Sequence, residues 1–228
     1  MKVQVTLAVL AAVAASGTAL GAGGSFTGTF NGIVPPTPIT WSVTGGAFNN
    51  AGAAGFFNWN KTGGTYGGVS GNFDAFCLEL TETIQEPNSY SYKVVPLASG
   101  VAPDGDGSFT FPLNATQIAQ MSELWGRHRS SITAASATAF QLAIWEIVYD
   151  NNLIINGLGD SLQFTAPTPA GDIALAQFYL NSIDGTGPLM TLDAFTHPTQ
   201  QDQIVPAPGT IALLGVGGLL AARRRRSV

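Results

Sequence analysis

Two kinds of hydrophobic periodicity divide the chain. In residues 25–30 (SFTGTF) and 39–43 (ITWSV), apolar and polar positions alternate, which is the pattern of half-buried β-strands. Residues 73–84 (FDAFCLELTETI) and 90–97 (YSYKVVPL) also have strand-like patterns, with the turn-forming EPNS between them. The pattern predicts about three or four short strands before residue 70, followed by a hairpin of the two later segments.

Helical spacing of apolar residues begins after residue 113. Asn114 and Ser136 each precede such a stretch, and their side chains can cap a helix. The sequence predicts three helices and a closing strand, at 114–128, 137–149, 172–183 and 189–195. Residues 199–205 are expected to be a polar linker. The predicted fold class is therefore α+β: a predominantly β-sandwich-like domain with two to three packed helices.

The two ends of the chain differ from this middle region. Lys2, an apolar run at 3–15 and small residues up to Ala22 follow the order of a cleavable secretory signal. At the other end, an apolar run at 211–222 is shorter than the about 20 residues that cross a bilayer. We expect a signal peptide at 1–22, one extracellular domain at 23–203, and a tail at 204–228 that contacts the membrane transiently.

The tail combines a Pro-x-Pro motif, a short apolar segment and an arginine cluster. In this order it resembles the PEP-CTERM sorting signal of bacteria that make exopolysaccharide, although Ala207 stands where that signal usually has Glu. The resemblance covers about the last 24 residues and implies an exosortase-type membrane protease as partner. The residues that carry it are Pro206, Pro208, Gly209, Arg223, Arg224, Arg225 and Arg226.

Charge and cysteine content narrow the function of the middle region. It holds four Lys or Arg residues and all 14 acidic residues of the chain, so its net charge is near −10. Nucleic-acid binding is not expected, because neutralising phosphates requires clustered cations. The chain has one cysteine, Cys77. In an exported protein a single cysteine is a partner for another chain, a free thiol, or a chemically special group.

Gln141 is the other unusual residue, because it lies on an apolar stripe of the 137–149 helix between Phe140 and Leu142. A buried, unpaired amide costs a few kcal/mol. The amide therefore either hydrogen-bonds to the backbone or has been consumed in a reaction. One such reaction is attack by the Cys77 thiol on the Gln141 amide carbon, which expels ammonia and leaves an internal thioester.

Two short segments match this chemistry, FCLEL around Cys77 and FQLAIW around Gln141. Together, over about residues 73–150, they resemble the thioester domains of bacterial surface adhesins. The resemblance implies a Cys77–Gln141 thioester, with Phe76 and Trp145 supporting the site. It also implies a cell-surface or extracellular-matrix protein that bonds covalently to an amine-bearing surface protein or polysaccharide, without turnover and without a cofactor.

Other interpretations of the same residues remain open. A noncatalytic structural or carbohydrate-binding matrix protein could use Trp41, Trp59 and Tyr66 as an aromatic sugar platform. A cysteine hydrolase would pair Cys77 with His128 or His197, but no local signature supports it. His128 is expected at a solvated helix end and His197 in a surface turn. Asp104 and Asp106 resemble the start of a calcium loop, although the later ligands are absent.

Overall fold

The computed structural model describes residues 24–43, 48–97, 113–150 and 152–208. The signal peptide, the calcium candidates Asp104 and Asp106, and the tail from Gly209 onward lie outside the described residues. Within the described ranges, no helix is long and apolar enough to span a membrane.

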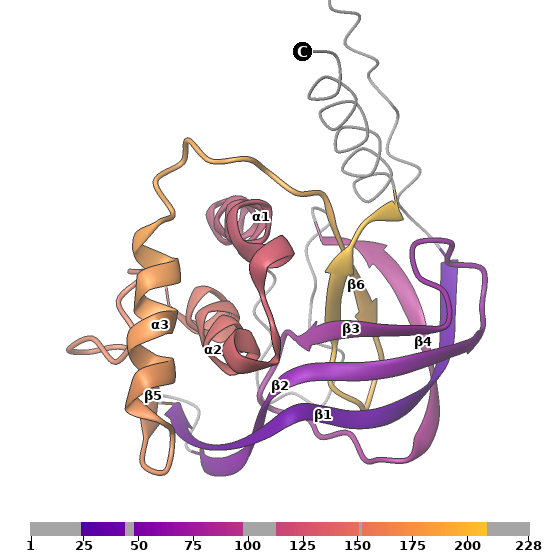
Figure 1. Ribbon diagram of the computed structural model, residues 1–228, viewed down its shortest axis with the longest axis horizontal. Helices are drawn as coiled ribbons and strands as arrows, with labels where there is room; N and C mark the ends of the chain where they lie inside the picture. Colours follow the sequence, from indigo (N-terminus) through magenta and orange to yellow (C-terminus); the bar gives the residue numbers. More distant parts are fainter. Residues whose placement is uncertain (1–23, 44–47, 98–112, 151, 209–228) are drawn as a thin grey trace, which may run out of the picture.

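The described strands form one antiparallel sheet that closes on itself. Its order is β2-β3-β7-β6-β4-β1, and β1 also pairs with β2, so six strands make a barrel while β5 extends β1 at one end (Figure 1). The prediction of an α+β fold is confirmed, but the sheet is a closed barrel where two packed sheets were expected. The strands are β1 Gly24–Val43, β2 Phe48–Gly63, β3 Asn72–Cys77, β4 Asn88–Pro96, β5 Leu162–Thr165, β6 Leu192–Thr196 and β7 Gln203–Pro206.

Strand β1 is much longer than the sequence pattern indicated, because it contains both predicted segments, 25–30 and 39–43. Its register against β2 shifts between Val34 and Thr37, and so it skips Pro35 and Pro36. Proline has no N–H to donate to a ladder, so a strand tolerates it at such an irregularity. The first part of β1 pairs with β4 and the last part with β5, so this one strand links the barrel to the helical side.

Two strand predictions are wrong. β3 ends at Cys77 and pairs with β2 and β7, whereas β4 pairs with β1 and β6, so the two segments do not form a hairpin. The expected polar linker at 199–205 contributes β7, in which Ile204 and Val205 are fully buried between β3 and β6. The barrel therefore continues past the predicted domain boundary at residue 203.

The three predicted helices are present, with shifted ends. Asn114 caps the first as predicted, accepting hydrogen bonds from the backbone N–H groups of Thr116 and Gln117. The second begins earlier than expected, because Thr133 is its cap and Ser136 is the reciprocal member of the capping box. The helices are α1 Ala115–His128, the short 3₁₀ turn η2 Arg129–Ser131, α2 Ala134–Tyr149 and α3 Ala170–Asn181.

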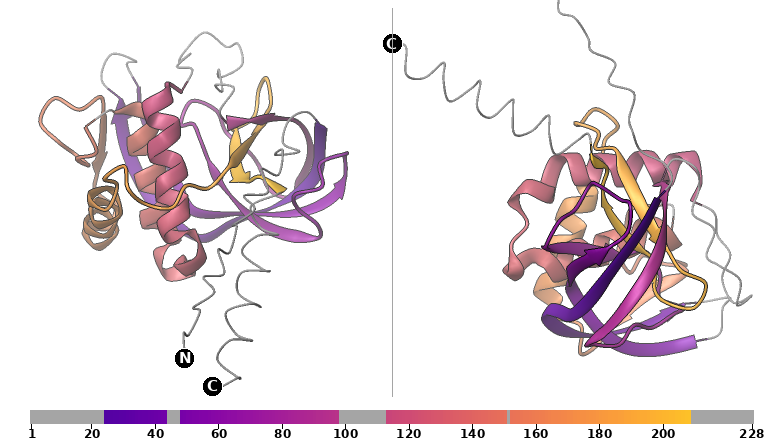
Figure 2. Two further views of the ribbon diagram at one scale, coloured as in Figure 1. Left: turned by 90° about the horizontal axis from the view of Figure 1, so that it is seen from above. Right: turned by 90° about the vertical axis from the view of Figure 1, so that its right-hand side faces the viewer.

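The helices pack on one side of the barrel, with α3 on the far side of α1 and α2 from it (Figures 1 and 2). Every residue of α2 from Ala137 to Ile147 is buried, so this helix lies within the core and lacks the exposed face of a surface helix. Phe76 of β3 meets the helices at this junction, with ring centroids 4.9 Å from Phe140 and 5.7 Å from Trp125. The core is therefore continuous from the barrel into the helical layer.

Candidate functional site

Cys77 is the last residue of β3, where that strand leaves its pairing with β7. Its side chain is fully buried. After Cys77 the chain departs from regular strand geometry, and Leu78 donates its backbone N–H to the Asp202 carbonyl. The cysteine thus lies at a strand end that faces α2.

Gln141 of α2 pairs with the backbone of Cys77 in both directions. The Cys77 N–H donates to Gln141 Oε1 at 2.8 Å, and Gln141 Nε2 donates to the Cys77 carbonyl at 2.8 Å. Both residues are fully buried. The side-chain amide acts as a short extension of the sheet, satisfying two backbone groups that would otherwise be buried without partners. The Gln141 amide thus has hydrogen-bond partners in the backbone of the residue whose thiol is proposed from sequence to react with it.

The thiol is held in a dry and electronegative environment. Cys77 Sγ lies 2.8 Å from the Glu79 carbonyl oxygen, to which it donates. Burial raises the pKa of the Cys77 thiol well above its usual value, and the nearby Glu79 and Asp202 carboxylates raise the pKa further. The thiol is therefore neutral at physiological pH. Burial protects the Cys77 sulfur from alkylating reagents whether or not it is bonded to Gln141. A folded protein that resists alkylation is therefore not evidence of a thioester.

The two residues predicted to support the site lie on either side of it. Phe76 fixes β3 against the helices through its ring contacts with Trp125 and Phe140. Trp145 is 1% exposed and lies close to the thiol. Its side chain lowers the pKa of Cys77, against the larger rise that burial causes. Its ring also lies 6.3 Å from that of Trp41 in β1. Both aromatic residues therefore belong to the packing around Cys77.

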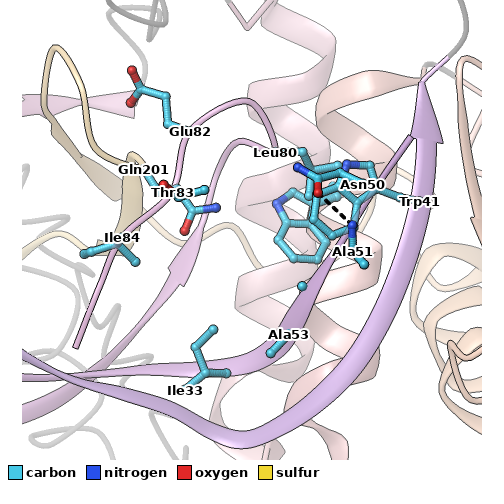
Figure 3. A pocket seen from close by; sticks show the side chains of 12 residues that line it. Ile33, Trp41, Asn50, Ala51, Ala53, Leu80, Glu82, Thr83, Ile84 and Gln201 are labelled. Atoms are coloured by element: carbon cyan, nitrogen blue, oxygen red, sulfur yellow. Dashed lines mark hydrogen bonds between the residues drawn. The ribbon is translucent and has the colours of Figure 1, made fainter. Parts of the chain in front are cut away.

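A pocket of about 180 Å³ adjoins this packing. Trp145 and Trp41 line it, together with residues of β2 and of the segment 80–84 that follows Cys77 (Figure 3). Trp145 therefore contributes both to the lining of this pocket and to the surroundings of the thiol.

Comparison with protein-family models finds no match, and comparison with curated proteins finds none either. Two solved structures are similar. The N-terminal thioester domain of a surface protein from Clostridium perfringens matches with a TM-score of 0.41 and 9% identity, over 74% of this chain and 97% of that one. The N-terminal domain of the Streptococcus pyogenes pilus tip adhesin Cpa matches with a TM-score of 0.39 and 15% identity, over 78% and 97%.

At TM-scores of 0.41 and 0.39 and identities of 9% and 15%, these similarities assign neither a family nor a function to the chain. The chemistry of the site is therefore argued from the side chains described above.

The alternative functional residues are not arranged as those hypotheses require. Trp41, Trp59 and Tyr66 are at most 7% exposed, so they are core residues and do not form a surface platform for sugars. The thiol donates to a carbonyl oxygen, and His128 Nε2 is 2.7 Å from Ser182 Oγ between α1 and α3. His128 is at the end of α1, as expected, but it is partly buried against Ser182 at the end of α3.

Sequence reasoning missed a cluster of buried carboxylates at the end of α2. Glu146, Asp150 and Asp160 are all buried, and one carboxylate oxygen of each lies within 4.8 Å of one from each of the others. Glu146 stands among apolar residues in the segment AIWEIVYD. That position, an acid on a helix with no exposed face, was the sequence signal that could have revealed the cluster.

Proposed function

We propose that this chain is an exported surface protein in which Cys77 and Gln141 form an internal thioester that reacts once with an amine on a partner molecule. The observation that supports this most is the reciprocal pairing of the Gln141 amide with the Cys77 backbone, between fully buried residues 64 positions apart in sequence. Proximity favours bond formation, and exclusion of water protects a thioester from hydrolysis.

Formation of the bond begins from the neutral thiol. The Cys77 sulfur attacks Cδ of Gln141, the carbon–nitrogen bond of the amide breaks, and ammonia leaves with the thiol proton. Because burial raises the thiol pKa, this proton has to pass to the departing nitrogen as the new bond forms. The pairing with Cys77 holds the amide in a fixed orientation for this step.

Capture of a partner reverses the exchange at the same carbon. An amine nitrogen attacks Cδ of Gln141, the carbon–sulfur bond breaks, and the sulfur takes up a proton that the amine loses. The product is an amide between Gln141 and the partner, together with a free Cys77 thiol. The site is consumed in this reaction, so the protein acts as a covalent adhesin and not as an enzyme. In this proposal the pocket beside Trp145 is the route by which the amine arrives.

Methylamine labelling tests this mechanism. Untreated protein, unfolded at mildly acidic pH with a maleimide present, is expected to remain unlabelled because its sulfur is acylated. After methylamine treatment, Cys77 should take up one maleimide and peptide mapping should find a methylamide at Gln141. Cys77→Ala is the control and should show neither change. Full maleimide labelling of untreated protein, with an unmodified amide at Gln141, would contradict the mechanism.

We also propose that the chain is exported and sorted to the cell surface or extracellular matrix. The order of charged, apolar and small residues at the start supports a signal peptide, and the Pro-x-Pro, apolar and arginine order of the tail supports an exosortase-type protease as partner. Terminal sequencing of native extracellular protein should find both ends removed. Intact Met1 or Arg226 on that protein would count against this assignment.

A further inference from the structure

Three carboxylates converge where α2 ends. Glu146 lies in the last turn of the helix, Asp150 is its C-terminal cap residue, and Asp160 comes from the loop that leads to β5. Their exposed fractions are 0%, 8% and 4%, and one carboxylate oxygen from each residue lies within 4.8 Å of one from each of the other two. Two oxygens that ligate one calcium ion at 2.3–2.6 Å can be at most about 5 Å apart, so a single ion can reach all three carboxylates.

Among the residues that the structure describes, Glu146 has no partner for its charge. Its side chain is fully buried, and neither of its carboxylate oxygens forms a hydrogen bond within the described part of the chain. Burial, with smaller contributions from the neighbouring Asp150 and Asp160 carboxylates, raises the pKa of Glu146 to about 9. A buried, unpartnered carboxylate is costly unless a counter-charge or a proton accompanies it.

The other two carboxylates are already oriented by the backbone and by an amide. Asp150 accepts hydrogen bonds from the backbone N–H groups of Ser161 and Leu162, each at 2.8 Å. Asp160 accepts from the side-chain amide of Asn152. These bonds fix both groups without neutralising them, and each carboxylate has lone pairs left for a further ligand.

The position at the helix end adds a second reason for a cation. The C-terminus of a helix carries a partial negative charge, so acidic side chains there are unfavourable and cations are favourable. The last turn of α2 has no basic residue. The two arginines at the end of α1 are engaged elsewhere, since Arg127 bonds to Glu123 and Asp184 while Arg129 lies over aromatic rings.

We propose that Glu146, Asp150 and Asp160 bind a hard divalent cation, with Ca²⁺ as the preferred ion. All three side chains offer oxygen, the ligand atom that Ca²⁺ and Mg²⁺ select. Ca²⁺ fits better because it accepts an irregular set of carboxylates, whereas Mg²⁺ demands near-octahedral geometry and retains its waters. The ion ties the end of α2 to the segment 152–162 and to β5. This inference does not depend on the thioester.

Calcium titration of the purified, chelator-treated protein tests the site, with isothermal calorimetry and thermal unfolding as the two measurements. Wild type should bind one Ca²⁺ more tightly than Mg²⁺. Its Tm should rise by about 5–10 °C when Ca²⁺ is present at about 100 times its Kd. Glu146→Gln removes one ligand charge with little change in shape, and it should abolish both the binding heat and the rise in Tm.

Two further variants make the outcome decisive. Asp160→Asn should weaken Ca²⁺ binding at least about tenfold, since affinity follows the number of charged ligands. Glu86→Gln changes an exposed carboxylate and should bind Ca²⁺ like wild type. The site is refuted if wild type shows neither binding heat nor a change in Tm with Ca²⁺ or Mg²⁺ at about 10 mM, above the range of weak extracellular calcium sites. The cluster would then share a proton instead.

Discussion

Gln141 has a structural role that does not require the thioester. Its amide satisfies the N–H and the carbonyl of Cys77, both of which are buried. The Cys77 side chain, by contrast, adds only a small apolar group to the core. The two members of the pair should therefore contribute unequally to stability, although a thioester would need both equally.

Denaturant unfolding in a background that cannot form the bond separates these roles. Cys77→Ala alone should cost about 1 kcal/mol, the loss of a small buried group. Adding Gln141→Ala to this background should lower the free energy of unfolding by a further ~2–4 kcal/mol, because two buried backbone groups lose their partners. Gln163→Ala in the same background removes one partly buried amide that bonds to the Gly157 carbonyl, and should cost under about 1 kcal/mol. Equal costs for the two glutamine changes would contradict the structural role.

The proximity of Gln141 to Cys77 was expected from the resemblance of FCLEL and FQLAIW to segments of thioester domains. The apolar stripe by itself indicated only that the Gln141 amide needs a partner. The carboxylate cluster could not be found in the same way. Asp160 is near Glu146 because the segment 152–160 returns to the end of α2, and periodicity carries no information about such a return.

At the scale of elements, the helices were easier to predict than the strands. Asn114 and the apolar spacing after it are local signals, and α1 agrees with them closely. Strand partners depend on distant segments, so the alternation around Cys77 could not reveal that β3 pairs with β2 and β7. Pro35 and Pro36 also concealed the continuity of β1, because a register shift that skips prolines is not visible in the pattern.

Gly126 in α1 tests the packing between elements. A helical Gly→Ala change normally stabilises by about 1 kcal/mol. At Gly126, however, an added Cβ would lie 1.9 Å from the carbonyl oxygen of Pro188, so Gly126→Ala should destabilise by about 1–3 kcal/mol. Gly171→Ala in α3 meets no atom within 4 Å and should be neutral or slightly stabilising. Thermal unfolding of both variants checks this, and a stabilised Gly126→Ala would show that α1 does not pack so closely.

The whole molecule depends on β7, the last strand of the barrel. Ile204 and Val205 are fully buried, the Ala207 N–H donates to the Thr191 carbonyl, and the Tyr66 hydroxyl donates to the Pro206 carbonyl. Pro206, the first proline of the proposed sorting motif, is thus part of the folded barrel, whereas the sequence pattern predicted that it belongs to the tail.

Truncation tests this correction of the domain boundary. A chain of residues 24–208 keeps β7 and should unfold cooperatively. A chain of residues 24–203 loses two buried aliphatic side chains and the strand that joins β3 to β6. Its free energy of unfolding should fall by about 3–6 kcal/mol, which is comparable to the whole stability of many domains. Circular dichroism during urea unfolding compares the two chains, and equal midpoints would mean that the barrel does not need β7.

The central claim, a thioester between Cys77 and Gln141, is tested most directly by the intact mass of the mature protein. Burial shields the thiol in either state, so only covalent composition distinguishes them. Protein kept away from amines and high pH should weigh less than its processed sequence by one ammonia, and Cys77→Ala should restore the full mass expected for that variant. A wild-type protein that carries the full mass of its sequence would contradict the account.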